Sequence, residues 1–287
     1  MLRIGILLFW TLGVVSSVSA ARAGFPLVRE GRPAPVCYVG GEQVVKTALA
    51  IYAADAERVA GEAPARCDAP GNAVVVVGSL SEPERLDPLL RAWGVSAKAV
   101  EGRWEAFRIC EAFRNGERAL FVVGSDPRGT AYGVLELSRL LGVSPWEWWA
   151  DVTPRRSRTV TLTAGYDRTE APSVQYRGIF LNDEDWGLDP WGARYEGSGV
   201  AGELGPKTYS RVFELLLRLR ANTLWPAMHA STVAFYKVPG NREAAERYGI
   251  VVGTSHCEPM MRNNVGEWDE ARYGAYNFVT NLSLIHI

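Results

Sequence analysis

The sequence predicts an α/β protein in which a small N-terminal α/β domain is followed by the first part of a (β/α)8 barrel. Two observations lead to this prediction. Strand-like and helix-like segments alternate along the second half of the chain, as in parallel α/β architectures. Each predicted strand of that half is followed directly by polar or aromatic side chains, and a barrel assembles its active site at this C-terminal end of its strands.

The composition is that of a folded globular protein with one large or two ordinary domains. Of the 287 residues, 47% are hydrophobic and 22% are charged, which excludes a disordered chain or a fibre. The net charge is -1, from 31 basic and 32 acidic side chains. Because such a chain has no basic field that attracts phosphate backbones, we expect no nucleic-acid partner.

The first 23 residues have the pattern of a signal peptide. Arg3 gives a positive start, residues 4–15 are apolar, and small residues follow, with cleavage expected after Ala20 or Ala23. The apolar run is shorter than the roughly 20 residues that a spanning helix needs. We therefore expect a secreted or periplasmic protein that is free of the membrane after cleavage.

Residues 24–165 form the expected N-terminal domain. The run of four valines within residues 73–80 predicts a buried strand, and the apolar spacing of residues 82–93 predicts an amphipathic helix. Further strands are expected at 105–110, 119–124 and 159–163, and a helix is expected after Asp126. The Gly124–Asp126 loop could bind an anion at the start of that helix, but such a loop is more often a simple turn.

Residues 174–281 form the expected start of the barrel. The predicted strands are residues 174–181, 222–226 and 249–254, and the predicted helices are residues 206–221, which Pro206 opens, and residues 243–248. A doubly wound sheet would also gather ligand groups at strand ends. No G-x-G-x-x-G turn follows these strands, which weakens a dinucleotide-binding version of that fold.

The cysteines predict neither a disulfide framework nor a metal site. The four cysteines at 37, 67, 110 and 257 show no close C-x-x-C spacing, and four cysteines allow three pairings. The His-Cys-Glu run at 256–258 does not suit a metal, because adjacent residues of one strand cannot all face one ion. We expect no metal and no cofactor.

Three segments resemble a known family. They are YRGIFLNDEDW at 176–186, ANTLWPAMH at 221–229 and GTSHCEPM at 253–260, extended by RNN at 262–264 and EW at 267–268. They closely resemble glycoside hydrolase family 115, the xylan α-1,2-glucuronidases, and the resemblance covers about residues 24–281. Cys257 departs from the family pattern, in which we expect a smaller residue.

The resemblance implies a secreted inverting hydrolase that removes glucuronic acid or 4-O-methylglucuronic acid from xylan or glucuronoxylan oligosaccharides. Family members carry an N-terminal α/β domain, a (β/α)8 catalytic barrel and further domains, so the chain is expected to be an N-terminal fragment. Residues 282–287 break the pattern, and we expect them to be a translated sequencing adapter. As written, the fragment is expected to be inactive, whereas the full-length protein can form a homodimer.

Inverting hydrolysis needs a carboxylic acid that protonates the leaving oxygen and a carboxylate that activates water, about 6.5–9.5 Å apart. Asp183 is our first candidate for one of them, by its position in the matching motif and at the end of the first barrel strand. Glu184 and Asp185 are alternatives, because successive residues point in different directions. We expect the second catalytic carboxylate beyond Asn281.

The other polar and aromatic residues of these segments suit recognition of a uronic acid. Sugar hydroxyls, the uronate carboxylate or a pyranose face would be contacted by Asn182, Glu184, Asp185, Trp225, His229, His256, Glu258 and Arg262, and Trp186 and Trp191 could also stack on sugar. For each of these positions a purely structural role is the alternative.

Two other functions fit the same pattern. A secreted, non-catalytic glycan-binding protein would use the tryptophans and strand-end polar groups without cleaving the sugar. A hexosaminidase-like glycosidase would share the domain order but would need an Asp-Glu pair late in the barrel. The downstream coding sequence discriminates among the three.

Overall fold

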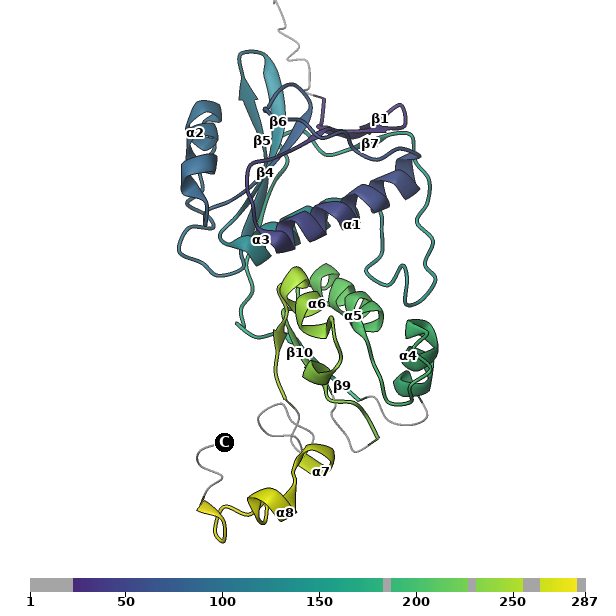
Figure 1. Ribbon diagram of the computed structural model, residues 1–287. Coiled ribbons are helices and arrows are strands. Elements are labelled where there is room, and N and C mark those ends of the chain that lie inside the picture. Colours follow the sequence, from purple (N-terminus) through teal and green to yellow (C-terminus); the bar gives the residue numbers. More distant parts are fainter. Residues whose placement is uncertain (1–22, 183–186, 227–230, 255–263, 283–287) are drawn as a thin grey trace, which may run out of the picture.

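The computed structural model describes residues 23–182, 187–226, 231–254 and 264–282. Figure 1 shows an N-terminal part built on a mixed sheet and a second part built on a short parallel sheet. Helices of the two parts pack against each other between the sheets. The predicted signal peptide lies almost wholly outside the described residues.

The N-terminal part contains a five-stranded sheet in the order β3-β4-β6-β5-β8. Its strands are β3 (Val36–Tyr38), β4 (Val74–Ser79), β5 (Phe107–Arg114), β6 (Glu117–Gly124) and β8 (Asp167–Glu170). β3, β4 and β6 are parallel, whereas β5 runs antiparallel to both of its neighbours. Every residue of β4 is buried, which confirms the strand predicted from its valine run.

Three helices cover the two faces of this sheet. They are α1 (Gln43–Ala60), α2 (Pro83–Trp93) and α3 (Pro127–Leu140). Figure 1 shows α1 and α3 on one face and α2 on the other. Because side chains alternate along a strand, Val75 and Val77 join the core on the α1 and α3 side, while Val74 and Val76 join the core with α2.

The Gly124–Asp126 loop is a strand-to-helix turn. The Asp126 carboxylate accepts a hydrogen bond from the backbone N–H of Gly129 (2.8 Å) and so caps α3. A Cβ on Gly124 would lie 2.1 Å from Oγ1 of Thr130, so only glycine fits this close approach. The carboxylate occupies the helix N-terminus where an anion would bind.

A second, antiparallel sheet has the order β2-β1-β7. It consists of β1 (Pro26–Arg29), β2 (Arg32–Pro33) and β7 (Val160–Thr161). The strand predicted at 159–163 therefore pairs with the start of the chain and does not extend the larger sheet. The prediction omitted β1, β2, β3, β8 and α1, because these strands have at most four residues and alanines dilute the periodicity of α1.

The second part contains three parallel strands in the order β9-β10-β11. Its elements are β9 (Gly178–Leu181), α4 (Leu188–Glu196), α5 (Pro206–Arg218), β10 (Thr223–Pro226), the 3-10 helix η1 (Phe235–Lys237), α6 (Asn241–Tyr248) and β11 (Val251–Val252), followed by the short α7 (Asn264–Glu267) and α8 (Glu270–Tyr273). The predicted strand–helix–strand–helix–strand order is confirmed. The helix α4 lies between the predicted strand 174–181 and the predicted helix 206–221, where no element was predicted. The closed barrel stays a prediction, since the described strands form an open sheet.

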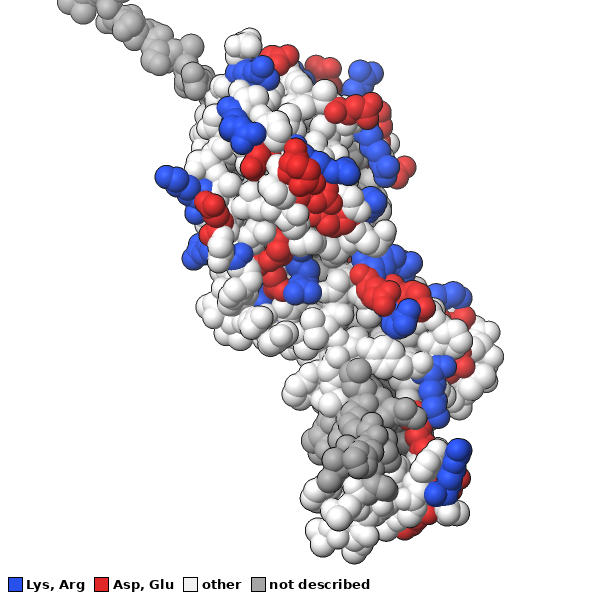
Figure 2. Space-filling view, turned by 60° about the vertical axis from the view of Figure 1, so that its left-hand side comes forward, with Lys and Arg blue, Asp and Glu red and all other residues white. Residues whose placement is uncertain are grey.

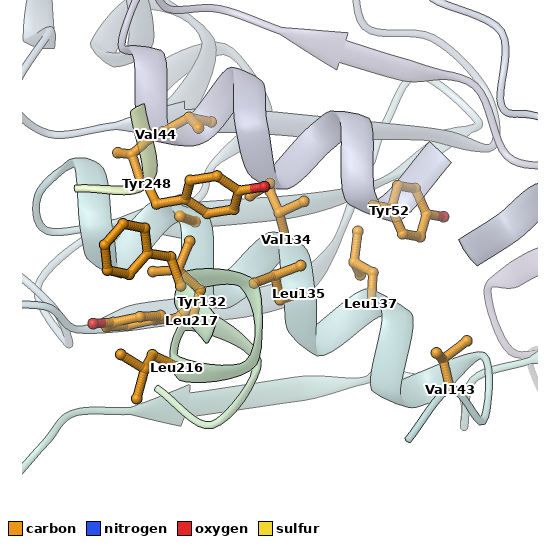
Figure 3. Close-up of a cluster of buried hydrophobic side chains, with 14 of the residues drawn as sticks. Val44, Tyr52, Tyr132, Val134, Leu135, Leu137, Val143, Leu216, Leu217 and Tyr248 are labelled. Carbon is orange, nitrogen blue, oxygen red and sulfur yellow. The ribbon is translucent and has the colours of Figure 1, made fainter. Parts of the chain in front are cut away.

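One hydrophobic core joins the two parts. Figure 3 shows Tyr52 of α1, Tyr132 of α3, Leu217 of α5 and Tyr248 of α6 among its buried side chains. The Tyr132 hydroxyl also donates a hydrogen bond to the Ala221 carbonyl (3.2 Å). The helices α1 and α3 are thus covered by the sheet on one side and by α5 and α6 on the other.

Acidic and basic side chains are interspersed on the face shown in Figure 2. Within the described residues, none of the helices combines the length and the apolar character that crossing a bilayer requires.

Candidate functional site

The C-terminal edge of the parallel sheet is where the predicted site residues attach. Leu181 at the end of β9 pairs with Pro226 at the end of β10, and Val252 of β11 pairs with Leu224. Neighbouring strands lie about 4.8 Å apart. The three segments that follow these strands therefore start beside one another at one edge of the sheet.

Two of the predicted site residues, Asn182 and Trp225, belong to the described part of the chain. The others lie outside it, namely Asp183, Glu184 and Asp185 after β9, His229 after β10, and His256, Glu258 and Arg262 after β11. Trp186 is also outside. The structure thus fixes where each group of residues leaves the sheet, and their convergence on one pocket stays a prediction.

Trp225 presents an indole ring on the open face of the sheet. Its side chain is 47% exposed, whereas Leu224, which points to the helix side, is fully buried. A Cβ on Gly253 would lie 2.2 Å from Nε1 of Trp225, so the indole lies against the backbone of Gly253, directly after β11. Phe180 pairs with Trp225 across the sheet and is also exposed.

This arrangement has the chemical groups that stacking on a sugar requires. An exposed indole offers a flat apolar face, and its N–H can donate a hydrogen bond. Asn182, the residue after β9, is exposed at the same edge and carries an amide that can both donate and accept. An aromatic platform beside a polar side chain is the chemistry that a pyranose ring with its hydroxyl groups requires.

The opposite ends of β9 and β10 are held by one buried carboxylate of the N-terminal part. Both oxygens of Glu105, which is 3% exposed, accept from Nδ2 of Asn222 (2.8 and 3.0 Å). The same carboxylate forms ion pairs with Arg128 (2.6 Å) and Arg177. Oδ1 of Asn222 accepts from the backbone N–H of Arg177 (2.9 Å), which links the two strand starts.

The electrostatics of this group favour its ionised form. Burial opposes ionisation of Glu105, but the hydrogen bonds from Arg177 and Asn222 and the charge of Arg128 outweigh it. Together they hold the pKa of the Glu105 carboxyl below its ordinary value. Glu105 is therefore a charged anchor for the starts of β9 and β10.

Sequence reasoning missed this anchor. Arg177 and Asn222 lie inside two of the quoted motifs, and both serve the fold at the end of the strands remote from the predicted pocket. Glu105 is 72 residues from Arg177 in the chain. Neither spacing nor composition connects residues so far apart, so the sequence carried no signal for this contact.

Trp191 belongs to an aromatic cluster at the junction of the two parts. Its ring stacks on Tyr195 (centroids 5.0 Å apart, planes at 14°) and contacts the rings of Trp148 and Trp149. The cluster borders a cavity of about 890 Å³, to which Gly187 also contributes. Because one face of the Trp191 indole is covered by Tyr195, its main role is packing.

Among the described residues, no three His, Cys, Asp or Glu side chains lie close enough together to hold a metal ion.

The sequence model of glycosyl hydrolase family 115 matches residues 169–286 of this chain. The chain is similar to the solved structure of BtGH115A, a family GH115 4-O-methyl-α-glucuronidase with specificity for decorated arabinogalactans. The identity is 46% and the TM-score is 0.81, over 91% of this chain and 34% of that one. The chain thus spans about a third of the length of that enzyme.

Two other solved structures are more distant. A mutant β-hexosaminidase of Streptomyces plicatus matches with 12% identity and a TM-score of 0.49, over 82% of this chain and 43% of that one. A GH138 enzyme that targets pectin rhamnogalacturonan II matches with 15% identity and a TM-score of 0.41, over 75% of this chain and 24% of that one. Both likenesses are too weak to carry an argument, and no curated protein matches the chain.

The family model covers the strands that lead to the predicted site, and the similarity to BtGH115A includes the N-terminal part as well. The chain therefore belongs to glycoside hydrolase family 115.

Proposed function

We propose that this chain supplies the N-terminal domain and part of the catalytic barrel of a glycoside hydrolase that releases α-1,2-linked glucuronic acid or its 4-O-methyl form from xylan. The observation that carries the proposal is spatial. In a family 115 chain, three polar segments start beside one another at one edge of the parallel sheet. In this proposal the segments form the rim of the sugar-binding pocket.

The proposed chemistry is hydrolysis with inversion by two carboxyl groups. One protonates the oxygen of the leaving polysaccharide while the other removes a proton from the attacking water on the opposite side of the sugar ring. Asp183, one residue beyond Asn182 at the end of β9, is the proposed member of the pair in this chain. Trp225 would stack on a pyranose ring, and Asn182 would hydrogen-bond its hydroxyls.

Decorated arabinogalactan is a second candidate substrate, because the name of the similar enzyme BtGH115A gives specificity for decorated arabinogalactans. Both polysaccharides would present a uronic acid to the same pocket, and they differ in the backbone that follows the cleaved bond. Residues outside the uronic-acid pocket would therefore decide between them.

The proposed function is tested with a protein that carries this chain within a complete barrel. Uronic acid release from 4-O-methylglucuronoxylan oligosaccharides and from decorated arabinogalactan is measured by chromatography. We expect release from xylan, and we expect Asp183→Asn to lower turnover by at least about 100-fold, the scale of a positioned acid or base.

The matched control is Asp87→Asn, which changes a half-exposed carboxylate on α2 and should leave turnover unchanged. Release from arabinogalactan alone would replace the xylan assignment. Binding of the oligosaccharide without any release would identify a glycan-binding protein, and near wild-type turnover of Asp183→Asn would remove that residue from catalysis.

Export and self-association belong to the same proposal. The leader-like residues 1–23 support secretion or transport to the periplasm, and cell fractionation with N-terminal sequencing tests it. The homodimer proposed for the full-length enzyme is tested by its mass in solution.

A further inference from the structure

Two cysteines that are 30 residues apart in sequence lie on adjacent extended segments. The backbone N–H of Val36 donates to the Ala65 carbonyl (2.8 Å), and the N–H of Cys67 donates to the Val36 carbonyl (3.0 Å). This is a parallel bridge between Val36 and Arg66. One residue further along both segments, Cys37 stands opposite Cys67.

Both side chains point to the same side of the sheet. Cys37, 1% exposed, belongs to the core that β4 shares with α2, and Cys67 packs against that core as well. Neighbouring parallel strands place facing Cα atoms about 5 Å apart, within the range of about 4.4–6.8 Å that a disulfide spans. The backbone therefore suits a covalent bond between the two sulfur atoms.

The thiols also interact electrostatically. Burial raises the pKa of the Cys37 thiol to about 11, and the neighbouring Cys67 thiol adds to this increase. Burial likewise raises the pKa of Cys67. Such protonated thiols are poor nucleophiles near neutral pH, so the pair does not have the character of a catalytic or redox-sensing site.

Access differs between the two residues. Cys67 is partly exposed and borders a cavity of about 330 Å³ beside Tyr38 and Lys46, whereas Cys37 is buried. A third cysteine, Cys110 of β5, is also buried, and its partners across the sheet are Phe121 and Asp167. Cys67 is thus the thiol of this pair that a small oxidant can reach.

We propose that Cys37 and Cys67, which are free thiols in this structure, form a structural disulfide when the protein meets an oxidising thiol pool. The Cys67 thiolate attacks a small disulfide such as oxidised glutathione, forms a mixed disulfide and releases one thiol. The Cys37 thiolate then attacks the Cys67 sulfur and displaces the second thiol. Two cysteine thiols are oxidised, one external disulfide is reduced to two thiols, and each attacking sulfur gives up its proton.

The bond would close a chain loop that contains the whole of α1. It would also fix the loop after α1 to β3, the edge strand of the five-stranded sheet. Closing a loop of this length stabilises a protein mainly by restricting its unfolded chain. The occurrence of the bond in cells rests on the proposed export, whereas the ability of the two residues to pair does not.

The experiment equilibrates the purified 287-residue chain with reduced and oxidised glutathione at mildly alkaline pH. Free thiols are then alkylated, the protein is digested without reduction, and the linked peptides are identified by mass spectrometry. We expect a Cys37–Cys67 peptide in the wild type and in Cys110→Ala, and a glutathione adduct on Cys67 in Cys37→Ser. Oxidation should raise the melting temperature of the wild type by several degrees and leave that of Cys67→Ser unchanged.

Complete alkylation of both residues, or a link from either one to Cys110 or Cys257, would overturn the proposal. A second arm isolates the same 287-residue chain from the cells that express it under non-reducing conditions, before any glutathione is added. A bond that forms with glutathione but is missing from this material would count against export and leave the pairing intact.

Discussion

Glu105 shows how a single residue of one part positions the elements of another. Its carboxylate is buried and contacts Arg128, Arg177 and Asn222, of which the last two immediately precede β9 and β10. A buried ion pair is a weak source of net stability, but removing one partner leaves the other charges without compensation. Glu105 is therefore more important for keeping the strands in place than for the total free energy of folding.

We expect Glu105→Gln to lower the free energy of unfolding by about 3 kcal/mol, the scale of breaking a buried pair. Glutamine keeps the shape of the side chain and removes the charge that compensates the arginines. Urea unfolding followed by circular dichroism measures the change, with the exposed Glu101→Gln as control. A variant as stable as the wild type would show that Glu105 is dispensable.

Among the elements, the three parallel strands differ from the buried strands of the N-terminal sheet. One side of β9, β10 and β11 packs on the helices through residues such as Leu224, while Phe180, Trp225 and Val251 on the other side are exposed. In the proposed barrel this open side would face the interior, and Trp225 near its C-terminal end would face the bound sugar.

Trp225→Ala should therefore raise the KM for the oligosaccharide by roughly 2- to 12-fold, which corresponds to the 0.5–1.5 kcal/mol typical of an aromatic contact. Steady-state kinetics of the complete enzyme measures it. Trp146→Ala is the matched control, because Trp146 has the same 47% exposure but lies in the N-terminal part. An equal change in both variants would exclude a specific stacking role for Trp225.

The elements also show what sequence periodicity can predict. The valine run of β4, the apolar face of α5 and the order of the three parallel strands were predictable, because each has a local pattern. The two-residue strand β2 and the three-residue strand β3 lack such a pattern. The partner of β7 depends on a strand more than 130 residues away, and such long-range pairing leaves no local trace.

At the scale of the whole molecule, buried carboxylates of the N-terminal part hold basic side chains of the second part. Arg218 at the end of α5 pairs with Asp55 of α1 (2.7 Å), and Arg220 pairs with Glu136 of α3 (2.6 Å). Glu105 repeats this arrangement with Arg177. Together with the shared hydrophobic core, these ion pairs make the two parts one unit.

This arrangement predicts sensitivity to acid. Burial opposes ionisation of Glu136, but Arg139, Arg220 and Arg168 outweigh it and hold the pKa of its carboxyl below the ordinary value, as in Glu105. A group whose pKa is lowered on folding stabilises the protein above its unfolded pKa, about 4.3 for glutamate. That stability is lost as the pH falls through the folded pKa.

We therefore expect the melting temperature to change little between about pH 6 and 7 and to fall steeply below about pH 4. Differential scanning calorimetry across this range measures the profile. The double variant Glu105→Gln/Glu136→Gln should show a flatter acid limb than the wild type. An equally steep acid limb in the double variant would assign the acid sensitivity to other groups.

As with the fold, only those features of the site that have a local sequence pattern could be predicted. The motifs at the strand ends predicted Asn182 and Trp225 as site candidates, and the structure places both at one edge of the parallel sheet. The positions of Asp183, His229 and His256 around a common pocket depend on the loops beyond that edge. No local pattern sets the path of such loops.

The most direct test is an experimental structure, with glucuronic acid bound, of a protein that carries this chain within a complete barrel. We expect residues 182–185, 228–229 and 256–258 to surround one sugar at the C-terminal edge of β9, β10 and β11, with a carboxylate oxygen of Asp183 within hydrogen-bond distance of the anomeric oxygen or of the attacking water. A structure in which these three segments lie on different faces, or in which the sugar binds away from this edge, would contradict the proposed site.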